Sequence, residues 1–239
     1  MPEHAILGRL ANKVCVIAGA AGVIGEATAG RLRREGATVV GVDQRAHSVG
    51  VLSVEADLTA EAEVERTFAR IYQEFGRIDV LFNNAGLNDP DDHSALDMTQ
   101  ETWDRVFAAN LTTTFLSCKH GIPYLLRNDP PSGSVINTAS FLAVMGAATS
   151  QMAYSAAKAA VIQLSRDLGT HLARRGVRVN ALCLGPIETP QLRELFSRQQ
   201  LRWRVVGMSP PAGARLRASR STVSASAARK ASLAAVVLP

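Results

Sequence analysis

Short β-branched runs alternate with longer helical stretches along most of this chain, and that alternation constrains the fold more than any other feature. The runs are apolar nearly throughout, which is typical of parallel strands covered by helices on both faces. We expect strands at Val14 to Ile17, Thr38 to Val42, Val51 to Val54, Ile78 to Phe82, Ser134 to Asn137 and Val177 to Ala181. We expect helices at Glu26 to Glu35, Ala60 to Phe75, Gln100 to Arg127 and Tyr154 to Arg174. The pattern predicts one α/β domain with a parallel sheet.

A glycine-rich turn, Ala18 to Gly25, joins the first expected strand to the first expected helix. Glycines let a backbone approach a pyrophosphate, and the helix N-terminus supplies free amides, so this order predicts a doubly wound Rossmann-type fold that binds a dinucleotide. Asp43 ends the second strand, where an acid accepts hydrogen bonds from ribose hydroxyls and repels a 2′-phosphate. The sequence therefore favours NAD over NADP, although Arg45 would weaken the repulsion. The alternative is a packing turn without a ligand.

Tyr154 and Lys158 lie four residues apart in an expected helix, which places both side chains on one face. A phenol titrates near pH ~10, and a neighbouring cation favours its phenolate form. We therefore expect Lys158 to lower the pKa of Tyr154, and the pair to act as a general acid/base in an alcohol–carbonyl interconversion. The alternative is a solvated helix face, because this spacing also arises by chance.

Further motifs stand in order along the chain: Asp57, the run Asn83 to Gly86, Asn110, Ser140 and Thr189. With the glycine turn and the Tyr154–Lys158 pair, they resemble the short-chain dehydrogenase/reductase family from about Leu10 to Pro190. The resemblance implies a catalytic set of Asn110, Ser140, Tyr154 and Lys158. It also implies a cofactor site made of Gly19, Gly22, Val23, Ile24, Gly25, Asp43, Asp57, Leu58, Asn84, Ala85, Gly86, Tyr154, Lys158, Ile187 and Thr189.

By this resemblance, the chain transfers a hydride between NAD(H) and a secondary alcohol or ketone. Tyr154 would exchange a proton with the substrate oxygen, which Ser140 would polarise, while Asn110 would hold a water near Lys158. A 3-oxoacyl thioester reductase is the alternative activity. Apolar residues after Ser140 would line the substrate pocket, with Leu87 and the segment Gln191 to Phe196; these are Phe141, Leu142, Val144, Met145 and Met152. Asp91 to His93 are expected in a solvated loop that could instead contact a polar substrate.

Two positions depart from the family's usual glycine turn: Ala18 stands for a threonine and Val23 for the middle glycine. We expect Gly22 to take over the backbone freedom lost at Val23, because only glycine reaches positive φ without strain. After the sixth strand, Leu184-Gly185 replaces the usual Pro-Gly pair. These changes concern turn geometry and cofactor affinity and leave the proton-transfer groups unchanged.

The last 40 residues differ in composition from the rest of the chain. All 21 acidic residues lie at or before Glu194, whereas residues 200–239 hold seven basic residues, many Ser, Ala and Pro, and no acid. We expect a Rossmann-type domain at 1–199, a disordered or non-native basic tail at 200–239, and no terminal sheet strand. A shifted reading frame explains this better than a natural basic extension that contacts nucleic acid. A third reading of the chain is a catalytically impaired nucleotide-binding or interaction protein with a damaged C-terminus.

Cysteine, histidine and hydropathy patterns exclude several other classes. Three scattered cysteines and five histidines show no metal-ligand spacing, so we expect reduced thiols and no metal. No apolar run reaches the ~18 residues of a membrane span. We expect a cytoplasmic protein with a small-molecule alcohol or ketone substrate and no nucleic-acid or membrane partner. The resemblance implies a homodimer or homotetramer paired through Gln100 to Arg127 and Tyr154 to Arg174.

Overall fold

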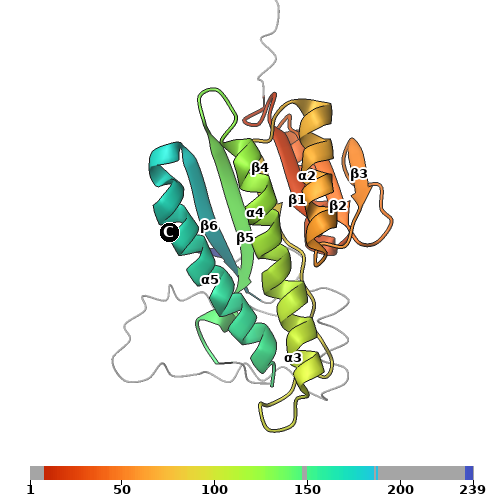
Figure 1. Cartoon of the computed structure of the whole chain (residues 1–239), viewed down its shortest axis with the longest axis vertical. Helices are drawn as coiled ribbons and strands as arrows, with labels where there is room; N and C mark the ends of the chain where they lie inside the picture. The colour runs from red at the N-terminus through yellow and green to blue at the C-terminus, as the bar shows by residue number, and fades with distance from the viewer. Residues whose placement is uncertain (1–7, 147–149, 186, 188–234, 239) are drawn as a thin grey trace, which may run out of the picture. The chain divides into compact units, whose positions relative to one another are not determined.

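A computed structural model describes residues 8–146, 150–185, 187 and 235–238 of the 239-residue chain (Figure 1). Its strands form one sheet in the order β3-β2-β1-β4-β5-β6-β7. The first six pair in parallel, and β7 pairs with β6 in antiparallel fashion. The strands are β1 (Val14–Ala18), β2 (Thr38–Asp43), β3 (Leu52–Glu55), β4 (Val80–Asn83), β5 (Gly133–Ser140), β6 (Val177–Leu184) and β7 (Ala235–Leu238). The predicted parallel α/β sheet is thereby confirmed.

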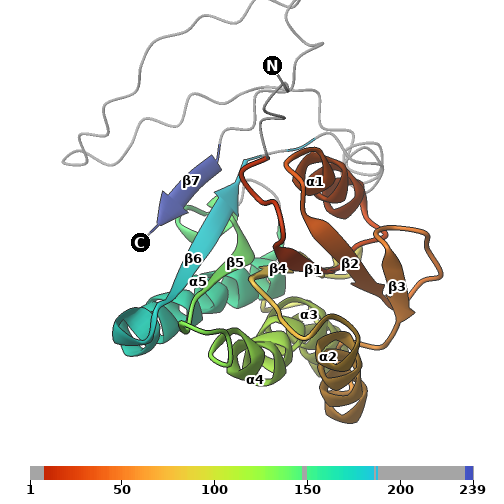
Figure 2. The same ribbon diagram turned by 90° about the horizontal axis from the view of Figure 1, so that it is seen from above.

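Helices cover both faces of this sheet (Figure 2). One described helix, α1, packs on β1 and β2, while the others lie against the opposite face, where α5 contacts β5 and β6. The longer helices are α1 (Val23–Arg34), α2 (Glu61–Phe75), α3 (Gln100–Phe107), α4 (Thr113–Leu125) and α5 (Met152–Leu172). Short 3₁₀ turns follow β5 and α5 at Phe141–Ala143 and Ala173–Arg175. This two-sided cover is the doubly wound arrangement that the sequence predicts.

Strand β1 shows how the sheet forms two apolar cores. All five of its residues are buried, and successive side chains point to opposite faces of a strand. Val14 and Val16 join the large core with Phe68 of α2, whereas Ile17 joins the smaller core with Ala29 of α1. Burial on both faces explains why the strand is apolar at every position instead of alternating. The packed β1 then fixes the start of the glycine turn that follows it.

The expected single helix from Gln100 to Arg127 is interrupted. A π-helical turn, η1 (Ala108–Thr112), separates α3 from α4 and carries the fully buried Asn110. Asn110 Nδ2 donates to Val106 O at 3.0 Å and also leaves the helix to reach Leu87 O at 2.8 Å. Such single π turns are frequent at functional sites. Helical composition alone does not reveal one, because the turn accompanies a contact with Leu87, which lies outside the helix.

The expectation that the terminal strand is missing is wrong. β7 extends the sheet beyond β6, with Ala181 opposite Leu238 and Leu184 opposite Ala235, and it belongs to the same compact unit as β1 to β6. The run is only four residues long, too short to be identified as a strand from its own sequence. Hydrogen bonding to the edge of β6 supplies what local propensity does not. The predicted domain boundary after residue 199 lies outside the described residues.

Candidate active site

The glycine turn holds its shape through two glycines that tolerate no side chain. Gly19 has φ +86°, and a Cβ atom there would lie 2.4 Å from the Ala85 nitrogen. A Cβ at Gly25 would lie 2.3 Å from the Gly19 carbonyl oxygen. Both distances are shorter than side chains permit, so the turn packs backbone against backbone before α1 begins. This packing leaves the amides at the start of α1 available to an anion.

Gly22 does not take the role that the sequence suggests. It stands at the N-cap of α1 with φ −88° and ψ 159°, an extended conformation open to any residue. A Cβ there would meet only the Gly19 oxygen, at 3.8 Å. The positive φ is at Gly19 instead, so the prediction for Gly22 is wrong. Val23 is tolerated because it is the first residue of α1 and its side chain is half exposed.

Asp43 lies beside this turn, at the carboxyl end of β2. Its side chain is largely buried: Oδ2 accepts from the Ala21 amide at 3.0 Å, and Oδ1 accepts from the Arg45 amide at 3.0 Å. The Arg45 guanidinium reaches the same Oδ1 through Nε at 3.4 Å. The Asp43 carboxylate is therefore anchored next to the glycine turn, in the position predicted for a group that hydrogen-bonds the ribose hydroxyls.

Asp57 and Leu58 follow β3 along the next connection. Asp57 is exposed, and its Oδ1 accepts from the amide and hydroxyl of Thr59, at 2.8 and 2.7 Å. The Asp57 amide donates to Glu63 of α2 at 2.8 Å, and Leu58 is buried. Asp57 therefore shapes the turn into α2 as well as offering a carboxylate to solvent.

The segment after β4 connects the cofactor side to the catalytic side. Asn84 Nδ2 donates to the Gly19 carbonyl at 3.3 Å, and Asn84 Oδ1 accepts from Thr138 Oγ1 at 3.3 Å. A Cβ added to Gly86 would lie 2.8 Å from Asn110 Oδ1 and 3.4 Å from Lys158 Nζ. Asn84, Ala85 and Gly86 therefore run between the glycine turn and the predicted catalytic residues.

Ser140, Tyr154 and Lys158 meet where β5 ends and α5 begins. The Ser140 hydroxyl is near enough to the Tyr154 phenol to affect its pKa, and it accepts from the Leu142 amide at 3.2 Å. Lys158 is 3% exposed; its Nζ donates to Thr138 O at 2.9 Å and lies 5.7 Å from the centre of the Tyr154 ring. A hydroxyl, a phenol and an ammonium therefore converge on one point of the sheet edge, which is the arrangement needed to hold and protonate an oxygen.

Burial governs the ionisation of this trio. It raises the pKa of Tyr154, and the hydrogen bond from Ser140 partly offsets that rise. Burial also lowers the pKa of Lys158 to about 8. The expectation that Lys158 lowers the pKa of Tyr154 is wrong for this structure, since loss of solvation around the phenol is the larger effect.

The Asn110 side chain is held entirely by backbone groups. Both of its amide hydrogens go to backbone carbonyls, at Leu87 and Val106, and its Oδ1 accepts from the Leu87 amide at 3.3 Å. The side chain therefore clamps the chain just after Gly86. Of the other predicted cofactor residues, Ile24 packs against the α1 core, Ile187 is half-buried, and Thr189 lies outside the described residues, as does the segment Gln191 to Phe196.

Asp92 is a site residue that the sequence interpretation missed. Only 2% of it is exposed, although the solvated-loop prediction placed it in water with Asp91 and His93, which are exposed. Its carboxylate accepts from the amides of Ala153 and Tyr154, at 3.0 and 2.8 Å. No local sequence signal identifies it, because the amides that it caps lie about 60 residues further along the chain.

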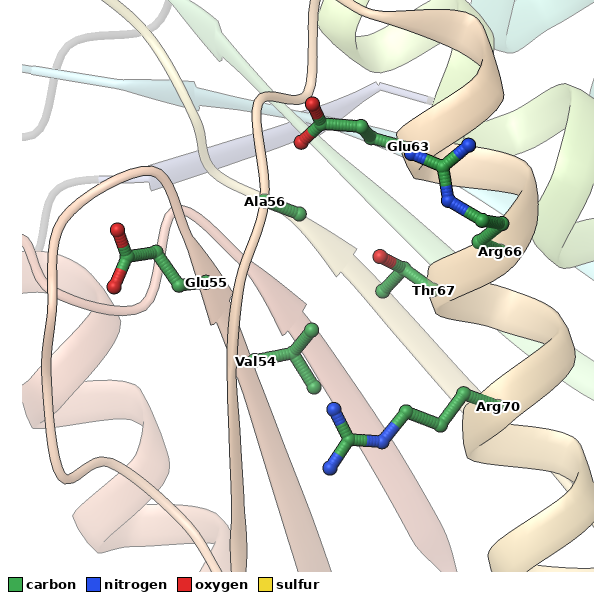
Figure 3. Close-up of a pocket in the computed structure, with 7 residues that line it drawn as sticks. All are labelled: Val54, Glu55, Ala56, Glu63, Arg66, Thr67 and Arg70. Atoms are coloured by element: carbon green, nitrogen blue, oxygen red, sulfur yellow. The ribbon is translucent and has the colours of Figure 1, made fainter.

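A separate pocket of about 200 Å³ lies between β3 and α2 (Figure 3). Val54, Glu55, Ala56, Glu63, Arg66, Thr67 and Arg70 line it. Arg70 extends from α2 toward Val54 of β3, whereas Glu55 points away from α2, and none of the predicted catalytic or cofactor residues lines the pocket. It is therefore distinct from the candidate active site.

The fold and site together define a class: a doubly wound α/β protein whose glycine turn leads to a serine–tyrosine–lysine centre. The model of the short chain dehydrogenase family matches residues 13–200. The chain belongs to the short-chain dehydrogenase/reductase family, whose members are oxidoreductases that use a nicotinamide cofactor. Within the described ranges, no helix has the length and apolar character to cross a membrane.

Relatives within the family act on different substrates. The chain is 35% identical over 199 residues to a 3-oxoacyl-acyl-carrier-protein reductase of Thermotoga maritima, covering 78% of this chain and 79% of the relative. It is 35% identical over 196 residues to a secoisolariciresinol dehydrogenase of Forsythia intermedia. The match covers 78% of this chain and 69% of the relative. The structure of a ligand-free aldohexose dehydrogenase of Thermoplasma acidophilum superposes with a TM-score of 0.75 at 29% identity. The match covers 81% of this chain and 74% of that structure's chain.

Proposed function

We propose that this chain is an NAD(H)-linked oxidoreductase that interconverts a secondary alcohol and its ketone. The observation that carries the proposal is the convergence of Ser140, Tyr154 and Lys158 beside Gly86, next to the turn built on Gly19 and Gly25. The turn fits a pyrophosphate, because it packs backbone against backbone at Gly19 and Gly25 and leads into the N-terminus of α1, whose amides can bind an anion.

The proposed cofactor contacts follow the chain order. Residues Gly19 to Gly25 hold the pyrophosphate, Asp43 holds the ribose hydroxyls, and Asp57 with Leu58 borders the adenine. Asn84 to Gly86 run beside the nucleotide, and Ile187 and Thr189 hold the carboxamide. The anchored carboxylate of Asp43 supports NAD over NADP, since a 2′-phosphate placed there would meet a fixed negative charge.

When bound, the nicotinamide supplies or accepts the hydride. Tyr154 supplies the proton: its raised pKa keeps the phenol protonated at neutral pH, ready to donate to a carbonyl oxygen that becomes an alcohol. Lys158, with a pKa of about 8, carries its charge near neutrality and lies beside Gly86, where it would hydrogen-bond the nicotinamide ribose. Ser140 orients the substrate oxygen, and Asn110 fixes Leu87 and Gly86 beside Lys158.

The surroundings of the trio favour an apolar or mixed substrate. Val144 and Met145 follow Ser140 within five residues, Met152 precedes Tyr154 by two, and all three are exposed. A 3-oxoacyl thioester is the second candidate substrate, supported by the 35% identity to a reductase of that class. We further propose a homodimer or homotetramer paired through the helical segments 100–127 and 154–174.

Initial rates test these proposals. The purified protein is offered NADH and NADPH with a panel of aliphatic ketones, cyclic ketones and a 3-oxoacyl thioester, and NADH binding is measured separately by fluorescence titration. We expect turnover of a ketone with NADH preferred. A preference for NADPH and the thioester would select the second candidate. NADH binding without turnover of any carbonyl would instead support an impaired nucleotide-binding protein.

A further inference from the structure

Asp92 bonds directly to the residue that carries the reactive phenol. Its two carboxylate oxygens take one amide each: Oδ1 accepts from Ala153 and Oδ2 accepts from Tyr154, at 3.0 and 2.8 Å. These amides belong to the first turn of α5, where backbone N–H groups have no partner within the helix. A carboxylate there is also favoured by the helix dipole. Asp92 therefore caps α5 from a distant part of the chain.

The segment that carries Asp92 is itself tied down on both sides. Before it, Asp89 is buried and accepts from Arg105 Nε of α3 at 2.7 Å, and Leu87 is held by the Asn110 side chain. After it, the Ala95 amide donates to the Met152 sulfur at 3.1 Å. α3 and α5 begin at the same end of the sheet, which lets one segment reach both (Figure 1). The carboxylate is consequently a fixed point and not a mobile loop group.

Position matters more at Tyr154 than elsewhere in the helix. The phenol has to meet a Ser140 hydroxyl on β5, while Lys158 is held independently by Thr138 on the same strand. Lys158 lies beyond the first turn of α5. Its hydrogen bond to Thr138 therefore holds that later part of the helix to β5, and the first turn depends on another contact. Helix ends fray readily. The hydrogen bond to Asp92 holds the Tyr154 backbone to a different segment of the chain.

We propose that Asp92 is a positioning residue: it fixes the first turn of α5 so that the Tyr154 phenol faces Ser140 and the substrate oxygen. The inference rests on the proposed function, because positioning has a catalytic meaning only if Tyr154 transfers the proton. A displacement of about 1 Å in a reacting group costs on the order of 100-fold in rate. Asp92 therefore acts on the turnover number while leaving the cofactor turn untouched.

Three variants test this role. Asp92→Ala removes both acceptors, Asp92→Asn keeps one acceptor oxygen, and Asp91→Ala is the matched control, an exposed carboxylate one residue away. For each we measure kcat for ketone reduction, the Kd for NADH, and hydrogen exchange of the peptide covering residues 150–160. We expect Asp92→Ala to lower kcat about 10- to 100-fold, with Asp92→Asn in between. The Kd should stay within about threefold, and Asp91→Ala should match the parent.

Faster exchange in residues 150–160 is expected for Asp92→Ala and not for Asp91→Ala. Parental kcat in Asp92→Ala would overturn the proposal, and so would a loss of NADH affinity as large as the loss of kcat. If Asp92→Ala does not fold, Asp92→Asn is compared with Asp91→Ala in the same three measurements. A parent protein without turnover would refute the proposed function instead, and the exchange data would then decide the capping role by themselves.

Discussion

The two halves of the candidate site are built in different ways. The centre of the cofactor half is a continuous stretch, the turn from Gly19 to Gly25, whose shape depends on the absence of side chains at two positions. The catalytic half is assembled from separate segments: Ser140 and Thr138 on β5, Tyr154 and Lys158 on α5, and Asp92 from the connection before α3. One half is a local backbone structure, and the other is a set of tertiary contacts.

This difference indicates how each half responds to change. A local turn fails when a side chain is added, since its backbone has nowhere to move. An assembled centre fails when a side chain is removed, since each group acts through a partner on another element. The catalytic half also contains a buried cation at Lys158, which opposes folding, whereas the glycine turn contains none. Four substitutions test the contrast.

Tyr154→Phe should give the largest effect. Removing the phenol oxygen eliminates the proton donor, so we expect kcat to fall by roughly 10²–10⁴-fold. The glycine turn is untouched, and the Kd for NADH should stay within about threefold. Steady-state rates and fluorescence titration measure the two quantities. Turnover at the parental rate would remove Tyr154 from the mechanism.

Gly19→Ala should act on the opposite half. The added methyl group would stand 2.4 Å from the Ala85 nitrogen at φ +86°, a strain of about 1–3 kcal/mol for the conformation alone. We expect NADH affinity to fall roughly 10- to 100-fold. Gly22→Ala is the matched control, because its φ of −88° and open surroundings accept a methyl group. Equal losses in both variants would refute the assignment of the strained position to Gly19.

Lys158→Met should stabilise the fold while abolishing turnover. The pKa of Lys158 falls from 10.5 to about 8 on folding, so the unfolded chain binds this proton more tightly. The resulting penalty is complete below pH 8 and is relieved as the pH rises through about 8 to 10.5. We therefore expect a gain of about 1–3 kcal/mol at pH 7 that shrinks toward pH 10.5. Urea unfolding at several pH values measures it.

Lys119→Met provides the control for this experiment, because Lys119 is half exposed on α4 and pairs with Glu61 at the surface. Its effect on unfolding should be small and nearly independent of pH. A pH-independent difference between the parent and Lys158→Met would mean that the ammonium is not desolvated in the folded chain.

Asp43→Ser should give the smallest change. Removing the carboxylate removes the repulsion toward a 2′-phosphate and the acceptor for ribose hydroxyls. We expect the ratio of kcat/KM for NADPH over NADH to rise by about tenfold, equivalent to about 1.4 kcal/mol. Arg45→Ala is the companion variant and should shift the ratio in the opposite direction. An unchanged ratio in Asp43→Ser would show that cofactor choice depends on other contacts.

Much of the fold could be predicted because each strand carries its own signal. β1 and β2 are β-branched and apolar, and the glycine turn follows at once. β7 could not be predicted, since four residues form a strand only against the edge of β6. The π turn at Asn110 was also hidden, because it accompanies a contact with Leu87 from another segment. The fold was therefore predictable where neighbouring residues determine it.

The candidate site divides in the same way. Gly19, Gly25 and Asp43 lie together as their spacing implies, and so do Ser140, Tyr154 and Lys158. The positive φ was assigned to Gly22 and found at Gly19, because its location depends on how the turn meets Ala85. Asp92 was expected in solvent, but it is buried and caps the first turn of α5. Neither contact can be inferred from nearby residues.

The order of the first six strands and of the main helices, the glycine-rich turn and the candidate reactive side chains were predicted from the sequence alone. Those features depend on the chemistry of each residue and its immediate neighbours. The ionisation of Tyr154 and Lys158, the capping of α5 by Asp92 and the pairing of β7 were decided only by the tertiary structure. Desolvation and long-range hydrogen bonds exist only after the chain has packed, so no local pattern specifies them.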